Sequence, residues 1–218
     1  MFHSLFKTWF HLTAAWGYPG VFLLMAIEST VFPLPSELVV PPAAYWTSHG
    51  QFSFWGVVVT AALGSWFGAA ISYWVARSVG RPLILKYGKY VFVPESKWLL
   101  AERWINRYSA SGIFFARLLP VVRHVVSLPA GAARISFALF SAMTLLGSFV
   151  WCTVLAWFGV HVLADQPGLL DDPDALMAVL KAKLLWFVIG AMVLLALYVL
   201  VELMSRRLKT QAVEHEAP

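Results

Sequence analysis

The chain has 218 residues, of which 60% are hydrophobic and only 12% are charged. A soluble globular domain carries roughly 25% charged residues, so this composition excludes one. The abundant aromatic residues and the scattered Gly and Pro also exclude a disordered or collagen-like chain. The class that remains is an integral membrane protein that forms one compact unit of a few helices.

The first two elements are not ordinary membrane spans. In residues 1–17 the only charged side chain is that of Lys7, and the stretch lacks the pattern of a signal peptide. We therefore expect an N-terminal helix at the membrane interface. Residues 19–46 are apolar, but Glu28, Glu37 and a cluster of prolines interrupt them. Each half of this stretch is too short to cross a bilayer, which predicts a re-entrant hairpin rather than a spanning helix.

A second stretch of the same kind, residues 111–133, contains Arg117, Arg123 and two prolines. It predicts a second re-entrant hairpin. Long apolar runs lie elsewhere, and a helix needs about 20 apolar residues to cross the bilayer. We therefore expect three spanning helices, near residues 52–78, 136–162 and 181–204.

The distribution of charge predicts how these helices are oriented. Basic residues gather in the loop 79–110 and in the tail 206–218, whereas the loop 163–178 holds four aspartates and no basic residue. Basic flanks mark the cytoplasmic side, so residues 18–205 are expected to form one membrane domain with a cytoplasmic C-terminus. Because the net charge of +5 reflects this orientation, no nucleic-acid partner is expected.

The two halves resemble each other at an offset of 83 residues. The matching pairs are Ser53-Phe54 with Ser136-Phe137, Leu63-Gly64-Ser65 with Leu146-Gly147-Ser148, and Trp74 with Trp157. Together with the opposite orientation of the halves, this similarity predicts an inverted repeat, which is typical of transporters. The alternative is a chance similarity between two helices that contain Gly and Ser. The predicted fold is an all-α polytopic membrane protein, in which each repeat is a re-entrant helical hairpin plus a transmembrane helix, with a further C-terminal transmembrane helix.

Glu28, Glu37, Arg117 and Arg123 lie in these broken apolar segments and are the candidate site. A charge at the membrane centre costs about 2.5–3.5 kcal/mol on insertion scales, and such charges mark substrate and proton paths. Arginine presents a fork of donors suited to phosphate, so the arginines are predicted to bind phosphate. Burial favours the neutral form of a carboxylate and a nearby arginine favours the charged form, so the glutamates are predicted to handle protons. The structural alternative is a buried salt-bridge network.

Other polar residues are weaker candidates. His124 follows Arg123 and is expected mainly to pack, with a part in proton relay left open. Cys152 is expected to be a small buried hydrophobic residue. The histidines lack the spacing of metal ligands, so no metal site is predicted. The sequence has no phosphate-binding loop that would predict ATP hydrolysis and no catalytic triad that would predict an enzyme. Three serines, Ser36, Ser127 and Ser136, are given a structural role in the hairpins.

Over residues 18–160 the chain resembles the DedA family, the bacterial members of the VTT/SNARE-associated membrane proteins. Four motifs carry the resemblance: Glu28-Ser-Thr with Pro33-Leu-Pro-Ser-Glu37; Gly64, Gly68 and Tyr73-Trp-Val-Ala-Arg77-Ser-Val-Gly80-Arg81; Phe115-Ala-Arg117-Leu-Leu-Pro120-Val-Val-Arg123 with Ser127-Leu-Pro-Ala-Gly131; and Gly147-Ser-Phe-Val-Trp151. Many members carry Asn after the Trp of the last motif, where this chain has Cys152, so no polar role is expected there.

The resemblance implies two facing re-entrant hairpins, a bacterial inner or plasma membrane location and a link to the proton-motive force. Some members return undecaprenyl phosphate to the cytoplasmic face, others are implicated in moving phosphatidylethanolamine, and eukaryotic relatives scramble phospholipids. The essential charged residues of the family correspond by motif to Glu28, Glu37, Arg117 and Arg123.

The predicted function is translocation of a lipid phosphate, undecaprenyl phosphate above all, with dependence on protons. The expected partners are this lipid or a phospholipid, together with protons, and self-association is left open. No cofactor, metal or enzymatic activity is expected. The alternatives are a phospholipid scramblase or phosphatidylethanolamine transporter, a proton-coupled exporter of small cations or drugs, and a membrane scaffold that transports nothing.

Overall fold

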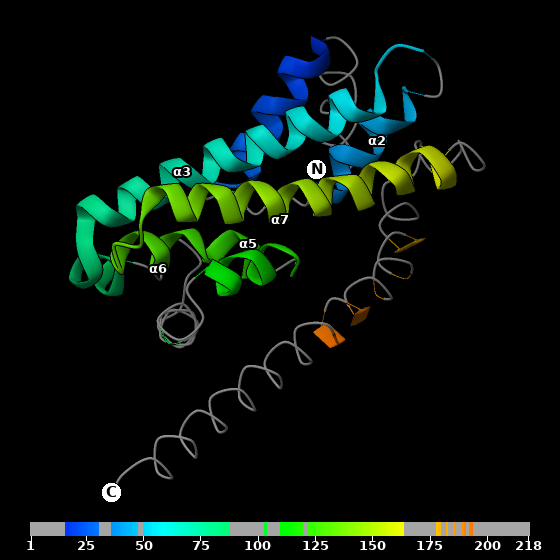
Figure 1. Ribbon diagram of the computed structural model, residues 1–218. Coiled ribbons are helices and arrows are strands. Elements are labelled where there is room, and N and C mark those ends of the chain that lie inside the picture. The colour runs from blue at the N-terminus through cyan, green and yellow to red at the C-terminus, as the bar shows by residue number, and fades with distance from the viewer. Residues whose placement is uncertain are drawn as a thin grey trace, which may run out of the picture. The chain divides into compact units, whose positions relative to one another are not determined.

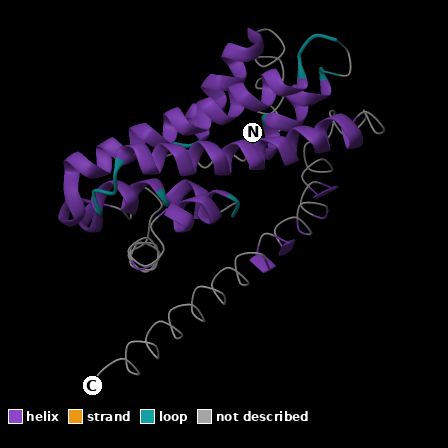
Figure 2. Cartoon of the chain, in the orientation of Figure 1, coloured by secondary structure: helices purple, strands orange, loops and turns teal. Residues whose placement is uncertain are grey.

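The structure is a computed structural model of the chain. It describes residues 16–30, 36–47, 50–87, 103, 110–119 and 122–163, with eight further positions between 178 and 193. For residues 79–87 and 162–163 only the backbone is described. The chain divides into two units, Met1–Leu180 and Lys181–Pro218. All regular structure in the described ranges is helical (Figure 2).

The first half contains one long helix, preceded by shorter pieces. Residues 16–28 are helical and end in a turn. The 3₁₀ turn η1 (Ser36–Leu38) and helix α2 (Val40–Tyr45) follow, and then α3 (Phe54–Tyr87). Pro41 and Pro42 lie in the first turn of α2, which accepts proline because the backbone N–H groups there have no partner inside the helix.

The second half repeats this order. Residues 110–117 are helical and end in a turn. The short helices α5 (Val122–Val125) and α6 (Ser127–Ala132) follow, and then the long helix α7 (Phe137–Phe158), which continues into the π-helical turn η3 (Gly159–Leu163). In both halves, therefore, short helical segments interrupted by turns precede a long apolar helix.

Two of the three predicted spanning helices are confirmed as long apolar helices. Residues Phe54–Ser78 and Phe137–His161 each form 25 residues of helix that are apolar enough to cross a membrane. Helix α3 continues to Tyr87, beyond the predicted end at residue 78, because the apolar run marks the part suited to lipid and not the end of the hydrogen-bonded helix. Most of the predicted span 181–204 lies outside the described residues.

Other predicted segments also lie outside the described residues. These are the interfacial helix except its last two residues, most of the loop beyond Tyr87, the acidic loop and the C-terminal tail. The proline breaks at residues 33, 35 and 120 fall there too. What the structure describes of 19–46 and 111–133 is a pair of interrupted helical stretches.

Helices α3 and α7 pack side by side, and the short helices pack against the long helix of the other half (Figure 1). Helix α6 packs on α3, and α2 packs on α7 and η3. Tyr73 of α3 joins the halves, because its hydroxyl donates to the carbonyl of Ile135 and its ring stacks on Phe140 at 4.7 Å. This crossed packing holds α2 and α6 against the long helices, and the charged segments η1 and α5 directly precede these two short helices in the chain.

Candidate functional site

Three of the four predicted site residues are almost completely buried. Glu28, at the end of the first helix, Arg117 and Arg123 are each 1% exposed, and Glu37 in η1 is half-buried. Glu28 and Arg123 come from different halves, yet Arg123 Nη2 lies 3.5 Å from Glu28 Oε1. The acidic and basic stretches therefore meet, as the cost of isolated buried charge predicts.

Arg123 is held by groups from both halves. Its Nη1 donates to Ser36 Oγ and its Nη2 donates to Ser65 Oγ, each at 3.3 Å. Its guanidinium lies 5.6 Å from the centre of the Trp151 ring, in the range of a cation–π interaction. Trp151 in turn donates its Nε1–H to Ser36 Oγ at 3.1 Å. One ion pair, two hydroxyls and an aromatic face thus orient this arginine.

Arg117 has a different environment. Its Nη2 donates to Ser127 Oγ at 2.8 Å, and no carboxylate lies within ion-pair distance of it in the described part of the chain. The Nε atoms of Arg117 and Arg123 are both buried, and neither has a hydrogen-bond partner among the residues that the structure describes. Buried arginine donors are normally satisfied, so this cluster has donor capacity to spare, and Arg117 has no carboxylate beside it among the described residues.

The remaining titratable residues lie beside Glu28. His124 Nε2 is 3.7 Å from Glu28 Oε1, which places the histidine in the charged cluster rather than in simple packing. Ser36 Oγ lies 3.4 Å from Glu37 Oε2, so Ser36 links Glu37 to Arg123. Cys152 is fully buried in α7, as predicted.

A row of serines was missed as part of the site. Ser36 and Ser127 were given a structural role only, but both accept hydrogen bonds from the buried arginines. Ser29, Ser65 and Ser148 connect Glu28 to α7 through hydroxyl contacts. A signal was present in the sequence, because Ser65 and Ser148 match each other at the offset of 83 residues.

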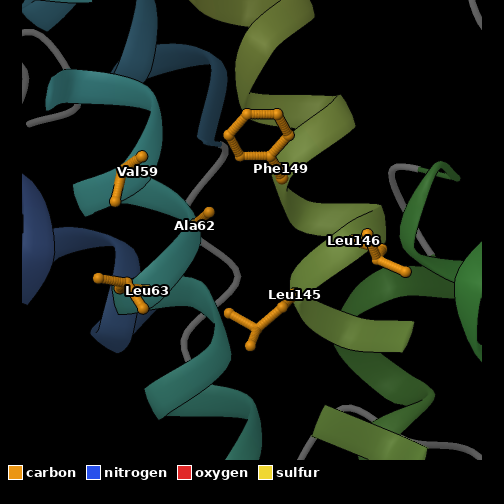
Figure 3. Close-up of a pocket in the computed structure, with 6 residues that line it drawn as sticks. All are labelled: Val59, Ala62, Leu63, Leu145, Leu146 and Phe149. Atoms are coloured by element: carbon orange, nitrogen blue, oxygen red, sulfur yellow. The ribbon is translucent and has the colours of Figure 1, made fainter. Parts of the chain in front are cut away.

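An apolar groove lies close to this polar cluster, between α3 and α7. Figure 3 shows Leu145 and Phe149 of α7 extending toward α3, where Ala62 lies. The groove has a volume of about 230 Å³, and its lining side chains carry no polar atom: Val59, Ala62, Leu63, Leu145, Leu146 and Phe149. Most of these residues are partly exposed, so the groove opens outward and suits a hydrocarbon chain.

Comparison with known proteins identifies a family and several relatives. The VTT domain family matches residues 35–161. The chain is 31% identical over 186 residues, 85% of this chain and 88% of the relative, to undecaprenyl phosphate transporter A of Bacillus subtilis (strain 168). It is 25% identical over 158 residues, 71% of this chain and 77% of the relative, to undecaprenyl phosphate transporter A of Staphylococcus aureus (strain NCTC 8325 / PS 47).

A third relative carries a different name. The chain is 31% identical over 173 residues, 75% of this chain and 80% of the relative, to an alkaline phosphatase-like protein of Lactococcus lactis subsp. lactis (strain IL1403). No solved structure was found to match the chain. The chain is a membrane protein that belongs to the VTT domain family, also called the DedA family.

Proposed function

We propose that this protein carries undecaprenyl phosphate across the bacterial inner membrane toward the cytoplasmic face, driven or modulated by the proton-motive force. Two relatives are named for this lipid. In the proposal, Arg117 and Arg123 bind the phosphate, and Glu28 and Glu37 take up and release protons. The C-terminus is cytoplasmic, as the basic tail predicts.

The observation that carries the proposal is the environment of Arg117. A buried guanidinium that contacts a hydroxyl and no carboxylate, in the described part of the chain, is a poor structural element, because desolvation costs free energy that no counter-ion returns. An anionic ligand would supply the missing charge. The arginine fork matches phosphate geometry, and the unbonded Nε atoms of both arginines are further donors.

The pairing of Arg123 with Glu28 supports a role for protons. The Glu28 carboxylate occupies a donor that a phosphate would need, at 3.5 Å from Arg123 Nη2. Protonation of Glu28 removes its charge and weakens this ion pair, so Arg123 becomes free to bind phosphate. Proton uptake and phosphate binding then favour each other, which is the condition for coupling.

The apolar groove supports a lipid as the substrate. It is lined by carbon atoms alone, and it lies one helical turn or less from Ser65 and Ser148 along both long helices. A phosphate near Arg123 would leave its hydrocarbon tail free to lie in this groove. The groove covers only a short part of such a tail. Because the groove is open to the outside, the rest of the tail can extend beyond it, and the groove sets no limit on the length of the tail.

We also propose that the two halves are inverted repeats with re-entrant hairpins. Contacts at the matched positions support this. The hydroxyls of Ser65 and Ser148 lie 3.3 Å apart, as expected for equivalent residues near a two-fold axis. A Cβ added at Gly64 would lie 2.4 Å from the carbonyl oxygen of Phe22 and 3.0 Å from the Cβ of Met25, three residues later. Gly147 meets Phe114 and Arg117, also three apart, in the same way.

The test is transport by the purified protein in liposomes that contain fluorescent undecaprenyl phosphate or, separately, fluorescent phospholipids. We expect undecaprenyl phosphate to become accessible to a membrane-impermeant quencher, faster with a proton gradient. Arg117→Ala and Arg123→Ala should abolish this movement. Arg134→Asn is the matched control, because Arg134 is exposed and its positive φ of 54° suits Asn.

The alternatives give different results in the same assay. Equal movement of phospholipids without any effect of the gradient would indicate a scramblase. A need for the glutamates combined with tolerance of arginine loss would indicate a cation exporter. If neither lipid moves, the proposal fails, and pairwise exchange of Glu28 and Arg123 without phenotype would favour a scaffold.

A further inference from the structure

We propose that the hydroxyls of Ser29, Ser65 and Ser148 form a hydrogen-bonded chain whose direction reverses when Glu28 takes up a proton, freeing a donor on α7 for an anionic head group. The inference rests on the proposed function and deepens it. It assigns to three serines a positioning role between the proton site and the long helix of the other half.

The geometry of the chain is continuous. Ser29 Oγ donates to Glu28 Oε2 at 2.7 Å, Ser29 Oγ lies 2.8 Å from Ser65 Oγ, and Ser65 Oγ lies 3.3 Å from Ser148 Oγ. Glu28 and the three serines are each at most 1% exposed. The chain starts in the turn after the first helix, crosses α3 and ends on α7. It therefore joins elements that no single ion pair joins.

With Glu28 charged, the donors can be assigned. A carboxylate only accepts, so the single hydroxyl proton of Ser29 goes to Glu28. Ser65 must then donate to Ser29. Arg123 Nη2 donates to Ser65 Oγ at 3.3 Å and takes one of its lone pairs, so Ser148 donates to the other. Every hydroxyl in the chain points toward Glu28, and Ser65 uses its whole capacity of one donor and two acceptors.

With Glu28 neutral, the same contacts allow the opposite direction. The carboxylic O–H on Oε2 donates to Ser29, Ser29 donates to Ser65, and Ser65 donates to Ser148. Ser65 still accepts from Arg123 and again uses its whole capacity. Each hydroxyl keeps its own proton and only rotates, so the proton on Glu28 is the only one added. The hydroxyl of Ser148 then no longer donates to Ser65, and its O–H can donate to another acceptor.

This rotation would act together with the ion pair. One protonation weakens the hold of Glu28 on Arg123 and frees an O–H on α7, so two donors become available for a phosphate. The other charged or titratable groups that face Glu28 are Arg123 and His124 by contact, and Arg117, Glu37 and Cys152 by electrostatic interaction. The serines transmit the state of Glu28 to Ser148 on α7. Arg123 also reaches α7, through Ser36 Oγ to Trp151, but the groups at both ends of that link are N–H groups that donate to the hydroxyl, so that link cannot reverse its direction.

The test is infrared difference spectroscopy of the purified protein between acidic and alkaline pH, without lipid substrate. The carbonyl band of protonated Glu28 is identified by its loss in Glu28→Gln. In Ser65→Ala and in Ser148→Ala this band should shift, because cooperative hydrogen bonds weaken when the chain is shortened. Ser148 reaches Glu28 through Ser65 and then through either Ser29 or Arg123, so the shift in Ser148→Ala is also measured in a Ser29→Ala background, where it should disappear if the hydroxyls carry it. Ser148→Thr should restore the wild-type band.

Ser141→Ala is the matched control, because Ser141 is a serine of α7 whose hydroxyl has no hydrogen-bond partner. A wild-type band in Ser148→Ala, or no protonation of Glu28 at any pH, would overturn the hydroxyl chain. The liposome assay on the same variants separates this from the proposed function. If wild type moves no undecaprenyl phosphate but the band shifts, only the transport proposal fails; if wild type transports and the band is unmoved, only the chain fails.

Discussion

The side chain of Arg117 lies directly against the backbone of Gly147. A Cβ added at Gly147 would be 2.6 Å from the Cβ of Arg117 and 3.1 Å from the carbonyl oxygen of Phe114. The first distance is too short for two carbon atoms, so α7 can approach the helix of residues 110–117 this closely only where it has no side chain. Arg117 is therefore positioned by the shape of α7 as well as by its hydrogen bond to Ser127.

Substitution Gly147→Ala should displace Arg117. Overpacking at a buried contact costs about 1–3 kcal/mol of unfolding free energy, and we expect transport to fall more than stability does, because the guanidinium moves away from Ser127. The measurements are a thermal melt in detergent and the liposome assay. Gly190→Ala is the control, since an added Cβ there meets no atom of the described residues within 4 Å. Wild-type transport by Gly147→Ala would mean that the contact does not position Arg117.

Substitution Arg117→Met should abolish transport without loss of stability. Methionine replaces the apolar stem of arginine out to about the position of Nε, and the change removes a buried charge that has no carboxylate partner in the described part of the chain. Because that charge is desolvated without compensation, its removal should leave the melting temperature unchanged or raise it. A structural role would give the opposite pattern, in which the melting temperature falls and the transport that remains is proportional to folded protein. Melting curves and transport on the same preparation distinguish the two.

Substitution Arg123→Ala should destabilise the protein and abolish transport. It leaves the Glu28 carboxylate buried without its ion pair, which costs about 3–5 kcal/mol when one partner of a buried pair is removed. The double variant Glu28→Gln with Arg123→Ala should regain much of that stability, because no buried carboxylate remains, but none of the transport. Equal stability of the single and double variants in a chemical denaturation series would contradict a compensating pair.

The sequence predicted the part of the fold that depends on hydropathy. Apolar length located the two long helices, and the prolines and charges located the interrupted stretches before them. The pairing of these stretches also followed, because isolated buried charge is costly, and Glu28 does meet Arg123. The end of α3 at Tyr87 did not follow, because a helix can continue past the apolar run.

The partners of the two arginines could not be predicted from residue types. Both arginines were expected to act alike, yet Arg123 has a carboxylate partner and Arg117 has a serine. This difference depends on how two turns are placed in space. The serines were undervalued because a hydroxyl is common in any helix, and only tertiary packing brings Ser65 of one half to Ser148 of the other.

Substitution Ala62→Leu should change which lipid tails the protein accepts. Ala62 lines the groove between α3 and α7 and is 3% exposed, so a larger side chain fills space that the proposed function gives to the prenyl tail. Transport of undecaprenyl phosphate should fall several-fold, whereas a short-chain polyprenyl phosphate, which needs less of the groove, should lose less. The measurement is the ratio of the two rates in liposomes. Ala138→Phe, at an exposed position of α7 outside the groove, is the control and should keep the wild-type ratio. An unchanged ratio in Ala62→Leu would mean that the prenyl tail lies outside the groove, because a larger side chain in the groove would then have no effect on the transport of either lipid.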